Sequence, residues 1–426
     1  MKRLSVVLIL LVFCLAAQPV LAAPYAYITQ VGLGALTVFD TVKNKKVATI
    51  DVGGNGRSPF AIAMSPDGRK AYVASQAWLG TLSPMVYVID VLDHSVTATI
   101  PVGAFPIGIA ILPNGTKLYV AGYTGPVPGG VPGITIIDTA TNTIDTTIPF
   151  GNFPFAVAAH PDSSKVYVTD IDNSTVTVID TASQNISQTV TVGTSPEGIA
   201  VHPDGTRVYV ANEESNNISV IDTFSNNVTE TISLFPAGYP NQIAFNPAGT
   251  RAYVTNDFGS SMWVIDATSN TVIGTINVGA DSVGVDVTKD GAYVYVVACS
   301  YDDTKDKEVN CGVRVIDAAT NTVKKKIKLL RQPYSMGKFI GGPQFHMTVQ
   351  TAGSGTGKVI SKKLPDIDCG SKCEADFYVN RKVQLQAVPD AGFVFTGWSG
   401  DCTGKGKTCK FVVTKDYSVT ATFEPK

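Results

Sequence analysis

The amino-acid sequence predicts an all-β protein: a seven-bladed β-propeller with four-stranded blades, followed by a small C-terminal β domain. Three observations predict this fold. A strand-like string with a central Tyr recurs seven times between residues 25 and 341, and a second string that ends in Asp follows it each time. The pattern then changes after Gly342, where four of the seven cysteines lie. Units of about 45 residues with four short strands are typical of propeller blades.

The first 23 residues are predicted to be a signal peptide. The basic start MKR precedes an apolar run and small residues, and cleavage is expected after Ala22 or Ala23. The run is shorter than the roughly 20 residues of a membrane span, and no later segment is long and apolar enough to be one. A lipid-anchored Cys14 is the alternative, although the preceding LVF lacks the small residues that such processing needs. We therefore expect an exported protein without a membrane span, located in the periplasm, on the cell surface or outside the cell.

Each predicted blade contains four strands in a fixed order: a Tyr strand, an Asp-ended strand, a Val/Ile/Thr-rich strand and a strand that usually opens with Pro. Alternating β-branched residues between Gly, Pro, Asn and Asp turns are the strand signal. The Tyr positions are Tyr27, Tyr72, Tyr119, Tyr167, Tyr209, Tyr253 and Tyr295. The Asp positions are Asp40, Asp90, Asp138, Asp180, Asp222, Asp266 and Asp317.

The order of the strands predicts how the ring closes. The repeats start at a Tyr strand and finish with one extra Pro-led strand, residues 333–340. The first blade is therefore expected to combine three N-terminal strands with this last strand, so that overlap of the two ends leaves no free sheet edge. The propeller is expected to span residues 24–343.

The literal strings of the repeats resemble a known family. YVTN at Tyr253–Asn256, YVAN at Tyr209–Asn212 and the recurring VIDT and PDG are similar to the YVTN family of β-propeller repeats. The family is found in exported bacterial and archaeal proteins, including surface-layer proteins. The resemblance implies a propeller but no particular function, because propellers serve as scaffolds and as enzymes. The Asn position varies in the other repeats, which is typical of a structural turn.

The two predicted faces of the propeller differ. One carries regular Pro-Asp-Gly strings and short turns, which is turn chemistry. On the other face, the Tyr-to-Asp spacing is 13 in four repeats but 18, 19 and 22 in the second, third and seventh. Insertions on one face of a repeat array are typical of a binding side, so Trp78, Asp302 and Asp303 are binding candidates. Calcium binding by the acidic stretch after Asp302 is an alternative that lacks the spacing of a calcium loop.

The residues just before the Pro position are predicted to ring the mouth of the channel. They are Ser58, Phe105, Phe153, Ser195, Tyr239, Asp281 and Gln332. Aromatic residues among polar neighbours predict a site for a ligand or a partner. The alternative is that the aromatic–Pro pairs wedge adjacent blades. His160 and His202 share one repeat position and are interpreted as turn residues rather than as metal ligands.

Residues 344–426 are predicted to form a separate small β domain. GSGTGKV, DCGSKC, GWSGDC and SVTATF resemble the divergent internalin-type B-repeat module of surface and secreted proteins. Trp398 is the expected core anchor, with sugar stacking as the alternative, and cysteines are the expected staples of so small a core.

Six cysteines are disulfide candidates in an exported chain: Cys299, Cys311, Cys369, Cys373, Cys402 and Cys409. Sequence neighbours are the natural pairs, although the sequence does not choose among the possible connectivities. Zinc is disfavoured because the usual paired spacing is absent.

These features favour a non-catalytic scaffold, which binds an envelope or surface protein or glycan as a monomer and without a metal or other cofactor. The chain contains no recognisable catalytic motif, and a net charge of −2 with 16% charged residues argues against nucleic acid as a partner. One alternative is a metal-assisted lactonase or lyase acting at the channel mouth, with Asp281 and Gln332 as the candidate ligands. The other is single-stranded nucleic acid binding by stacking on the ring aromatics.

Overall fold

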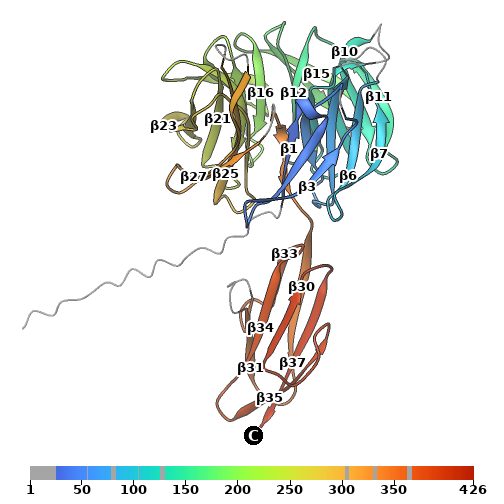
Figure 1. The fold of residues 1–426 in the computed structure, drawn as a ribbon, viewed down its shortest axis with the longest axis vertical. Helices are drawn as coiled ribbons and strands as arrows, with labels where there is room; N and C mark the ends of the chain where they lie inside the picture. The colour runs from blue at the N-terminus through green and yellow to red at the C-terminus, as the bar shows by residue number, and fades with distance from the viewer. Residues whose placement is uncertain are drawn as a thin grey trace, which may run out of the picture.

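The protein is all-β. The computed structural model describes residues 25–54, 56–77, 83–103, 105–124, 130–302, 307–329, 333–361 and 367–426; the predicted signal peptide, residues 1–23, lies outside them. The described residues contain no α-helix, and their only helical element is the 3-10 turn η1 (Val31–Leu33). They accordingly include no helix long and apolar enough to cross a bilayer. Figure 1 shows a propeller-like body of sheets and a smaller β domain that projects from it.

Seven sheets form the propeller-like body, and apart from β28 and β29 each consists of strands that follow one another in the chain. The first sheet contains β29 (Ile340–Gly341), β1 (Tyr25–Gln30), β2 (Ala35–Asp40) and β3 (Lys45–Asp51). The second contains β28 (Met336–Lys338), β4 (Arg57–Met64), β5 (Lys70–Ala77), β6 (Met85–Asp90) and β7 (Ser95–Pro101). The third contains β8 (Gly108–Ile111), β9 (Lys117–Thr124), β10 (Val131–Asp138) and β11 (Thr143–Pro149).

The other four sheets repeat this order. They contain β12 (Pro154–Ala159), β13 (Lys165–Asp170), β14 (Thr175–Asp180) and β15 (Asn185–Thr191); β16 (Pro196–Val201), β17 (Arg207–Asn212), β18 (Asn217–Asp222) and β19 (Asn227–Ser233); β20 (Tyr239–Phe245), β21 (Arg251–Asp257), β22 (Ser261–Asp266) and β23 (Thr271–Asn277); and β24 (Ser282–Val287), β25 (Tyr293–Asp302), β26 (Lys307–Asp317) and β27 (Thr322–Lys328).

The Pro-led strands lie innermost. Strands β4, β8, β12, β16, β20 and β24 contact one another in this order, and β28 lies against β24, β4 and β8. We call the end of the body where these inner strands begin the mouth face; it includes Phe105 and Tyr239. The other end, which carries the Pro-Asp-Gly turns with Gly68 and Gly205, is the turn face.

The recurring Tyr is buried in every sheet, and in some sheets its hydroxyl group also bonds to the next sheet. All seven of these side chains are fully buried. The hydroxyl of Tyr209 donates to Asn270 of the next sheet. The hydroxyl of Tyr295 donates to Oδ1 of Asn44 at 2.8 Å, which joins the last sheet to the first. A position that alternation alone marks as a strand therefore also holds the sheets together.

The recurring Asp holds the turn that follows it. In the first sheet, Oδ1 of Asp40 accepts the backbone N–H groups of Val42 at 2.9 Å and Lys43 at 2.8 Å. Asn44 then adopts a positive φ of 50°, which Asn tolerates better than most residues. These turns lie on the turn face, where the sequence predicts structural residues.

The segment from Pro333 to Gly341 lies between the last and the first sheets. Its β29 pairs antiparallel with β1, and Gln30 forms an isolated bridge with Pro333. Its β28 instead pairs parallel with β4 of the second sheet, which the sequence does not predict. Backbone N–H groups of Phe339 and Ile340 donate to Oδ2 of buried Asp286 in β24, at 2.9 and 2.7 Å. One segment is thus bonded to three sheets.

Two further sheets form the small domain. One contains β33 (Glu374–Tyr378), β30 (Gln344–Ala352), β37 (Tyr417–Pro425) and β35 (Phe393–Gly400), and the other contains β32 (Asp368–Cys369), β31 (Gly357–Ser361), β34 (Lys382–Pro389) and β36 (Thr408–Val412). Trp398 in β35 is buried; its indole N–H donates to the carbonyl of Gly406 at 2.7 Å, and its ring packs on Phe395. Disulfides join Cys369 to Cys373, Cys402 to Cys409 and, in the body, Cys299 to Cys311.

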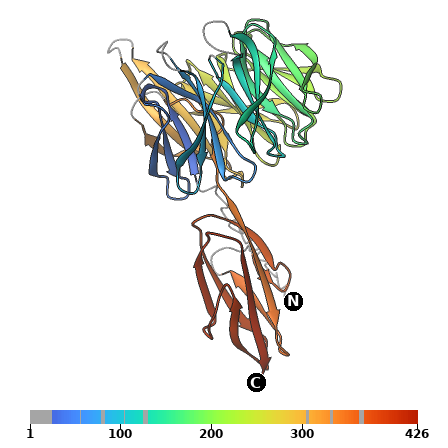
Figure 2. The ribbon, with the colours of Figure 1, turned by 90° about the vertical axis from the view of Figure 1, so that its right-hand side faces the viewer.

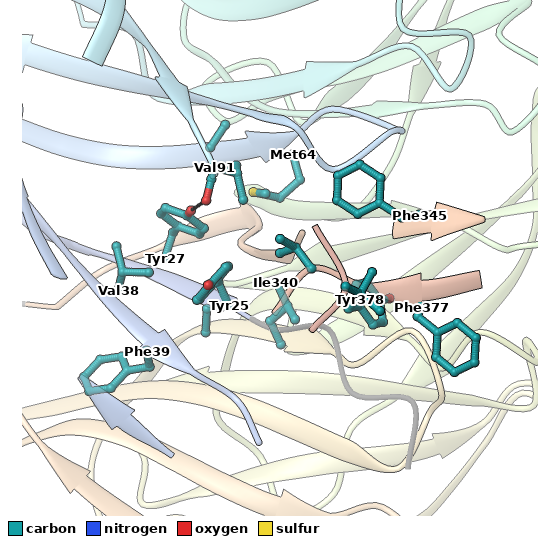
Figure 3. Close-up of a cluster of buried hydrophobic side chains, with 14 of the residues drawn as sticks. Tyr25, Tyr27, Val38, Phe39, Met64, Val91, Ile340, Phe345, Phe377 and Tyr378 are labelled. Atoms are coloured by element: carbon teal, nitrogen blue, oxygen red, sulfur yellow. Dashed lines mark hydrogen bonds between the residues drawn. The ribbon is translucent and has the colours of Figure 1, made fainter. Parts of the chain in front are cut away.

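The small domain is joined to the turn face, where Gly68 lies close to the backbone of Gly342; Figure 2 shows the domain projecting from the propeller-like body. A continuous buried cluster runs from the first sheet into the domain, and Figure 3 shows Tyr25, Ile340, Phe345 and Tyr378 within it. The amide of Asn380 donates to the hydroxyl of Tyr25 at 3.0 Å. The mouth face is therefore left free of this domain.

Gly68 lies at this junction and is expected to tolerate no larger residue. Its φ is +69°, and an added Cβ would lie 2.2 Å from the carbonyl oxygen of Gly342. Gly68→Ala should therefore lower the free energy of unfolding by about 1–3 kcal/mol. Denaturant unfolding measures this effect, and Gly274→Ala, whose Cβ meets no atom within 4 Å, is the control. Equal stability of the two variants would show that the junction can relax around the methyl group.

Candidate functional site

The predicted ring residues that the structure describes lie in different environments at the mouth face. Phe105 and Tyr239 are 47% and 48% exposed, whereas Ser58 and Ser195 are buried. Phe153 is half-buried and packs against a buried cluster. Only part of the ring is therefore available to a partner.

Of the remaining predicted candidates, some lie within the described residues and others do not. Asp281 is half-buried and hydrogen-bonded to Ser300. Gln332, Trp78 and Asp303 lie outside the described residues.

The described residues of the seventh-repeat insertion extend the hairpin of β25 and β26. The backbone of Asp302 ends β25 and pairs with Lys307 of β26. The Cys299–Cys311 disulfide joins the same two strands nearer the body. The disulfide therefore lies at the base of the hairpin extension.

The side chain at the variable Asn position holds the backbone of the ring residues. Oδ1 of Asn256 accepts the backbone N–H of Tyr239 at 2.9 Å. Oδ1 of Asp170, at the same repeat position, accepts the N–H of Phe153 at 3.2 Å. This position is structural, and it fixes the loop that leads into an inner strand.

Four carboxyl groups gather beside these loops, and we call them the acidic cluster. They are Glu197 in β16, Glu213 just after β17, Asp257 at the end of β21 and Asp281 just before β24. The side chains of Glu197 and Glu213 are hydrogen-bonded to each other, and Asp257 interacts electrostatically with both glutamates. Three neighbouring sheets thus bring together acids that are far apart in sequence.

The cluster favours protonated carboxyl groups. Burial, followed by the negative charges of Glu213 and Asp257, raises the pKa of Glu197 to about 8. Burial also raises the pKa of Asp257 to about 6, and it raises the pKa of Asp281 and Glu213. At neutral pH the Glu197–Glu213 pair therefore holds a proton.

Asn241 adds an unsatisfied acceptor to the cluster. Its Nδ2 donates to Oε2 of Glu197, so its amide group lies directly against that carboxyl. The side chain is only 1% exposed, and its Oδ1 has no hydrogen-bond partner. An unpaired buried acceptor is costly, so this oxygen is able to accept a further hydrogen bond.

The acidic cluster has no basic counterpart in the described part of the chain. No Lys, Arg or His there is a hydrogen-bond or ion-pair partner of any of its four carboxyl groups. Within the same ranges, no group of three or more His, Cys, Asp or Glu side chains is arranged to hold a metal ion.

Aromatic side chains border the cluster. Tyr239 is the cross-strand neighbour of Asp257, and its ring meets that of Phe258 edge-on at 5.5 Å. Phe258 is 73% exposed. On the inner side, burial and then the charge of Glu197 raise the pKa of Tyr334. An acidic centre with an exposed aromatic rim results.

Sequence reasoning missed three of the four acids, although the repeats contain the signal. Glu213 and Asp257 each stand four residues after the recurring Tyr, and Glu197 follows the recurring Pro of an inner strand. The other repeats have Val31, Gln76, Tyr123, Ile171 and Cys299 at the first position, and Phe60, Ile107, Phe155, Asn241, Val283 and Tyr334 at the second. An alignment of the repeats by position would have identified the acids as departures.

The histidines of the turn face connect sheets. Nε2 of His160 bonds to the carbonyl of Gly205, and Nε2 of His202 to that of Gly249, each at 2.7 Å. Both are turn residues, as the sequence suggests, and each also joins its turn to the next sheet.

Two solved structures have a fold similar to that of this protein. Hydrazine synthase of Kuenenia stuttgartiensis is 18% identical with a TM-score of 0.56, over 72% of this chain and 99% of that one. A functionally unknown protein from Desulfotomaculum acetoxidans DSM 771 is 16% identical with a TM-score of 0.59, over 75% of this chain and 98% of that one. At these identities the likeness concerns the fold alone. No curated protein matches the chain.

Two domain families match the sequence. Residues 348–426 match the divergent InlB B-repeat domain, which confirms the resemblance noted for the tail. Residues 25–241, which are 217 of 426 positions, match the choice-of-anchor I domain. With three disulfides, these matches point to an exported or surface protein. The chain belongs to the choice-of-anchor I domain family.

Proposed function

We propose that the protein is an exported, non-catalytic scaffold of the cell surface or envelope that binds a partner at its mouth face. In this proposal, residues 1–23 are a signal peptide, residues 24–343 form a seven-bladed YVTN-type propeller, and residues 344–426 form a spacer or adhesion domain. The protein acts as a monomer, without a cofactor. Overlap of β29 with β1 closes the ring.

One observation carries the proposal: the acidic cluster and its exposed aromatic rim lie on the face opposite the small domain. Aromatic residues are enriched where proteins bind one another. The domain family matches support a surface role. Because the small domain is attached to the turn face, the mouth face points away from that domain.

The exposed aromatics are expected to hold the partner. Replacing Phe105, Tyr239 and Phe258 together by alanine should reduce capture of a crosslinked partner in the producing cell by about tenfold or more, because such side chains contribute most of the binding energy at interfaces. Capture is measured by quantitative pull-down after crosslinking, with folding checked by thermal melting.

Phe224→Ala is the matched control, because Phe224 is 95% exposed but lies in a turn of the turn face. It should leave capture unchanged. Equal capture by the triple variant and the parent would remove the basis for a binding role of the mouth face.

The second candidate function is an enzyme at the same place, in line with the lactonase or lyase alternative. Glu197 favours it, because a carboxyl group that keeps its proton near pH 7 suits general acid catalysis. Turnover of an ester, lactone or uronate substrate that Glu197→Gln abolishes would favour this candidate over the scaffold.

A further inference from the structure

We propose that the acidic cluster binds the primary ammonium group of a lysine side chain presented by a partner protein. This inference rests on the proposed function and specifies what the mouth face recognises. It is carried by the Glu197–Glu213 pair, by the orphan oxygen of Asn241 and by the exposed aromatic rim.

The acceptors match the donors of an ammonium group. Lysine carries three N–H donors and no acceptor. Glu197 and Glu213 touch each other, and Asn241 touches Glu197, so carboxylate oxygens and the unpaired Oδ1 of Asn241 lie within one small region. An ammonium group bound by the two carboxyl groups brings N–H donors next to the Asn241 amide, whose Oδ1 has no hydrogen-bond partner.

Charge points to the same ligand. Four clustered acids without a described basic partner repel one another, and a bound cation removes that repulsion. The cation replaces the proton shared by Glu197 and Glu213, which is released to solvent. Binding of an ammonium group is therefore coupled to proton release near neutral pH.

The surroundings favour a lysine of a protein over a free cation. Tyr239, Phe258 and Phe235 are exposed around the mouth face, the last at 82%. Aromatic faces attract ammonium groups, and the aliphatic stem of lysine packs along apolar surface. A protein partner supplies both the ammonium group and the apolar contact area that the rim needs.

The test uses Nα-acetyl-lysine N-methylamide as the probe and isothermal titration calorimetry as the readout. The parent protein is expected to bind it, and Glu197→Gln and Glu213→Gln should each weaken binding by about tenfold or more. The matched control is Asp172→Asn, an exposed acid of the β13–β14 loop on the same face, which should bind as the parent does. In buffers with different ionisation enthalpies, the heats should differ by the amount expected for proton release.

Two further probes identify the chemistry. The Nε-acetylated form of the probe, which lacks the charge, and tetramethylammonium, which lacks N–H donors, should both fail to compete. The inference would be overturned if either of these two compounds bound as well as the original probe, or if folded Glu197→Gln bound the original probe as well as the parent does. Displacement of the probe by stoichiometric calcium would also overturn it. If Glu197→Gln abolishes probe binding but not capture of the cellular partner, ammonium recognition by that partner is refuted while the scaffold function stands. If the triple aromatic variant loses capture of the partner but Glu197→Gln does not, ammonium recognition is again refuted while the scaffold function stands.

Discussion

Asp286→Ala is expected to lower the free energy of unfolding by about 3–5 kcal/mol. The carboxylate of Asp286 accepts three backbone N–H groups: those of Phe339, Ile340 and its own neighbour Val287. Its removal leaves these buried donors unpaired, at about 1–3 kcal/mol each, while relief of the desolvated charge offsets part of the loss. Denaturant unfolding measures the total.

Asp286→Ala should loosen the segment around Asp286 before it affects the rest of the protein. Hydrogen exchange should accelerate first in residues 336–341 and in β1, because Asp286 connects β24 to the closing segment. Asp286→Asn, which keeps an acceptor oxygen, is expected to lose less than the alanine variant. If Asp286→Ala exchanges and unfolds like the parent, the segment is held by other contacts and this account of closure is wrong.

Raising the pH from about 5 to 9 is expected to destabilise the protein, and Glu197→Gln should remove a large part of this dependence. The pKa of Glu197 is raised in the folded state from 4.5 to about 8, so folding favours its protonated form. This contribution is fully present below the ordinary pKa and is lost as the pH rises through about 8. Because Glu197 is half-buried, we expect about 1–3 kcal/mol.

Other groups act in the same direction and define the control. The raised pKa values of Asp257 and Asp286, both about 6, destabilise the protein mainly between pH 4 and 6. The Glu197 contribution is therefore the difference in pH dependence between the parent and Glu197→Gln from about pH 5 to 9, measured as Tm against pH, because the other groups are common to both proteins. Parallel Tm curves for the two proteins would mean that Glu197 is already ionised when folded.

The sequence predicts what local chemistry dictates. The recurring Tyr and Asp appear as strand and turn residues because alternation and turn preferences act within a few positions, and Asp40 and Tyr295 fulfil those roles. The tail is predictable in the same way, since Trp398 and its neighbouring cysteines follow one compact pattern.

The site depends on contacts between sheets, which a single repeat does not encode. Glu197 meets Asn241 only because neighbouring sheets pack side by side. The raised pKa of Glu197 likewise arises from burial and from acids of other strands, not from its own neighbours in sequence. The parallel pairing of β28 with β4 was unpredictable because Met336–Lys338 has no alternating pattern of its own.

The most direct test of binding at the mouth face is site-specific photo-crosslinking in the producing cell. A photoreactive amino acid is introduced at Tyr239 on the mouth face or at Phe224 on the turn face, both exposed. We predict a defined partner adduct from position 239 only, and its loss when Glu197→Gln is added. Adducts that form from position 224 alone, or equally from both positions, would contradict the assignment of function to this face.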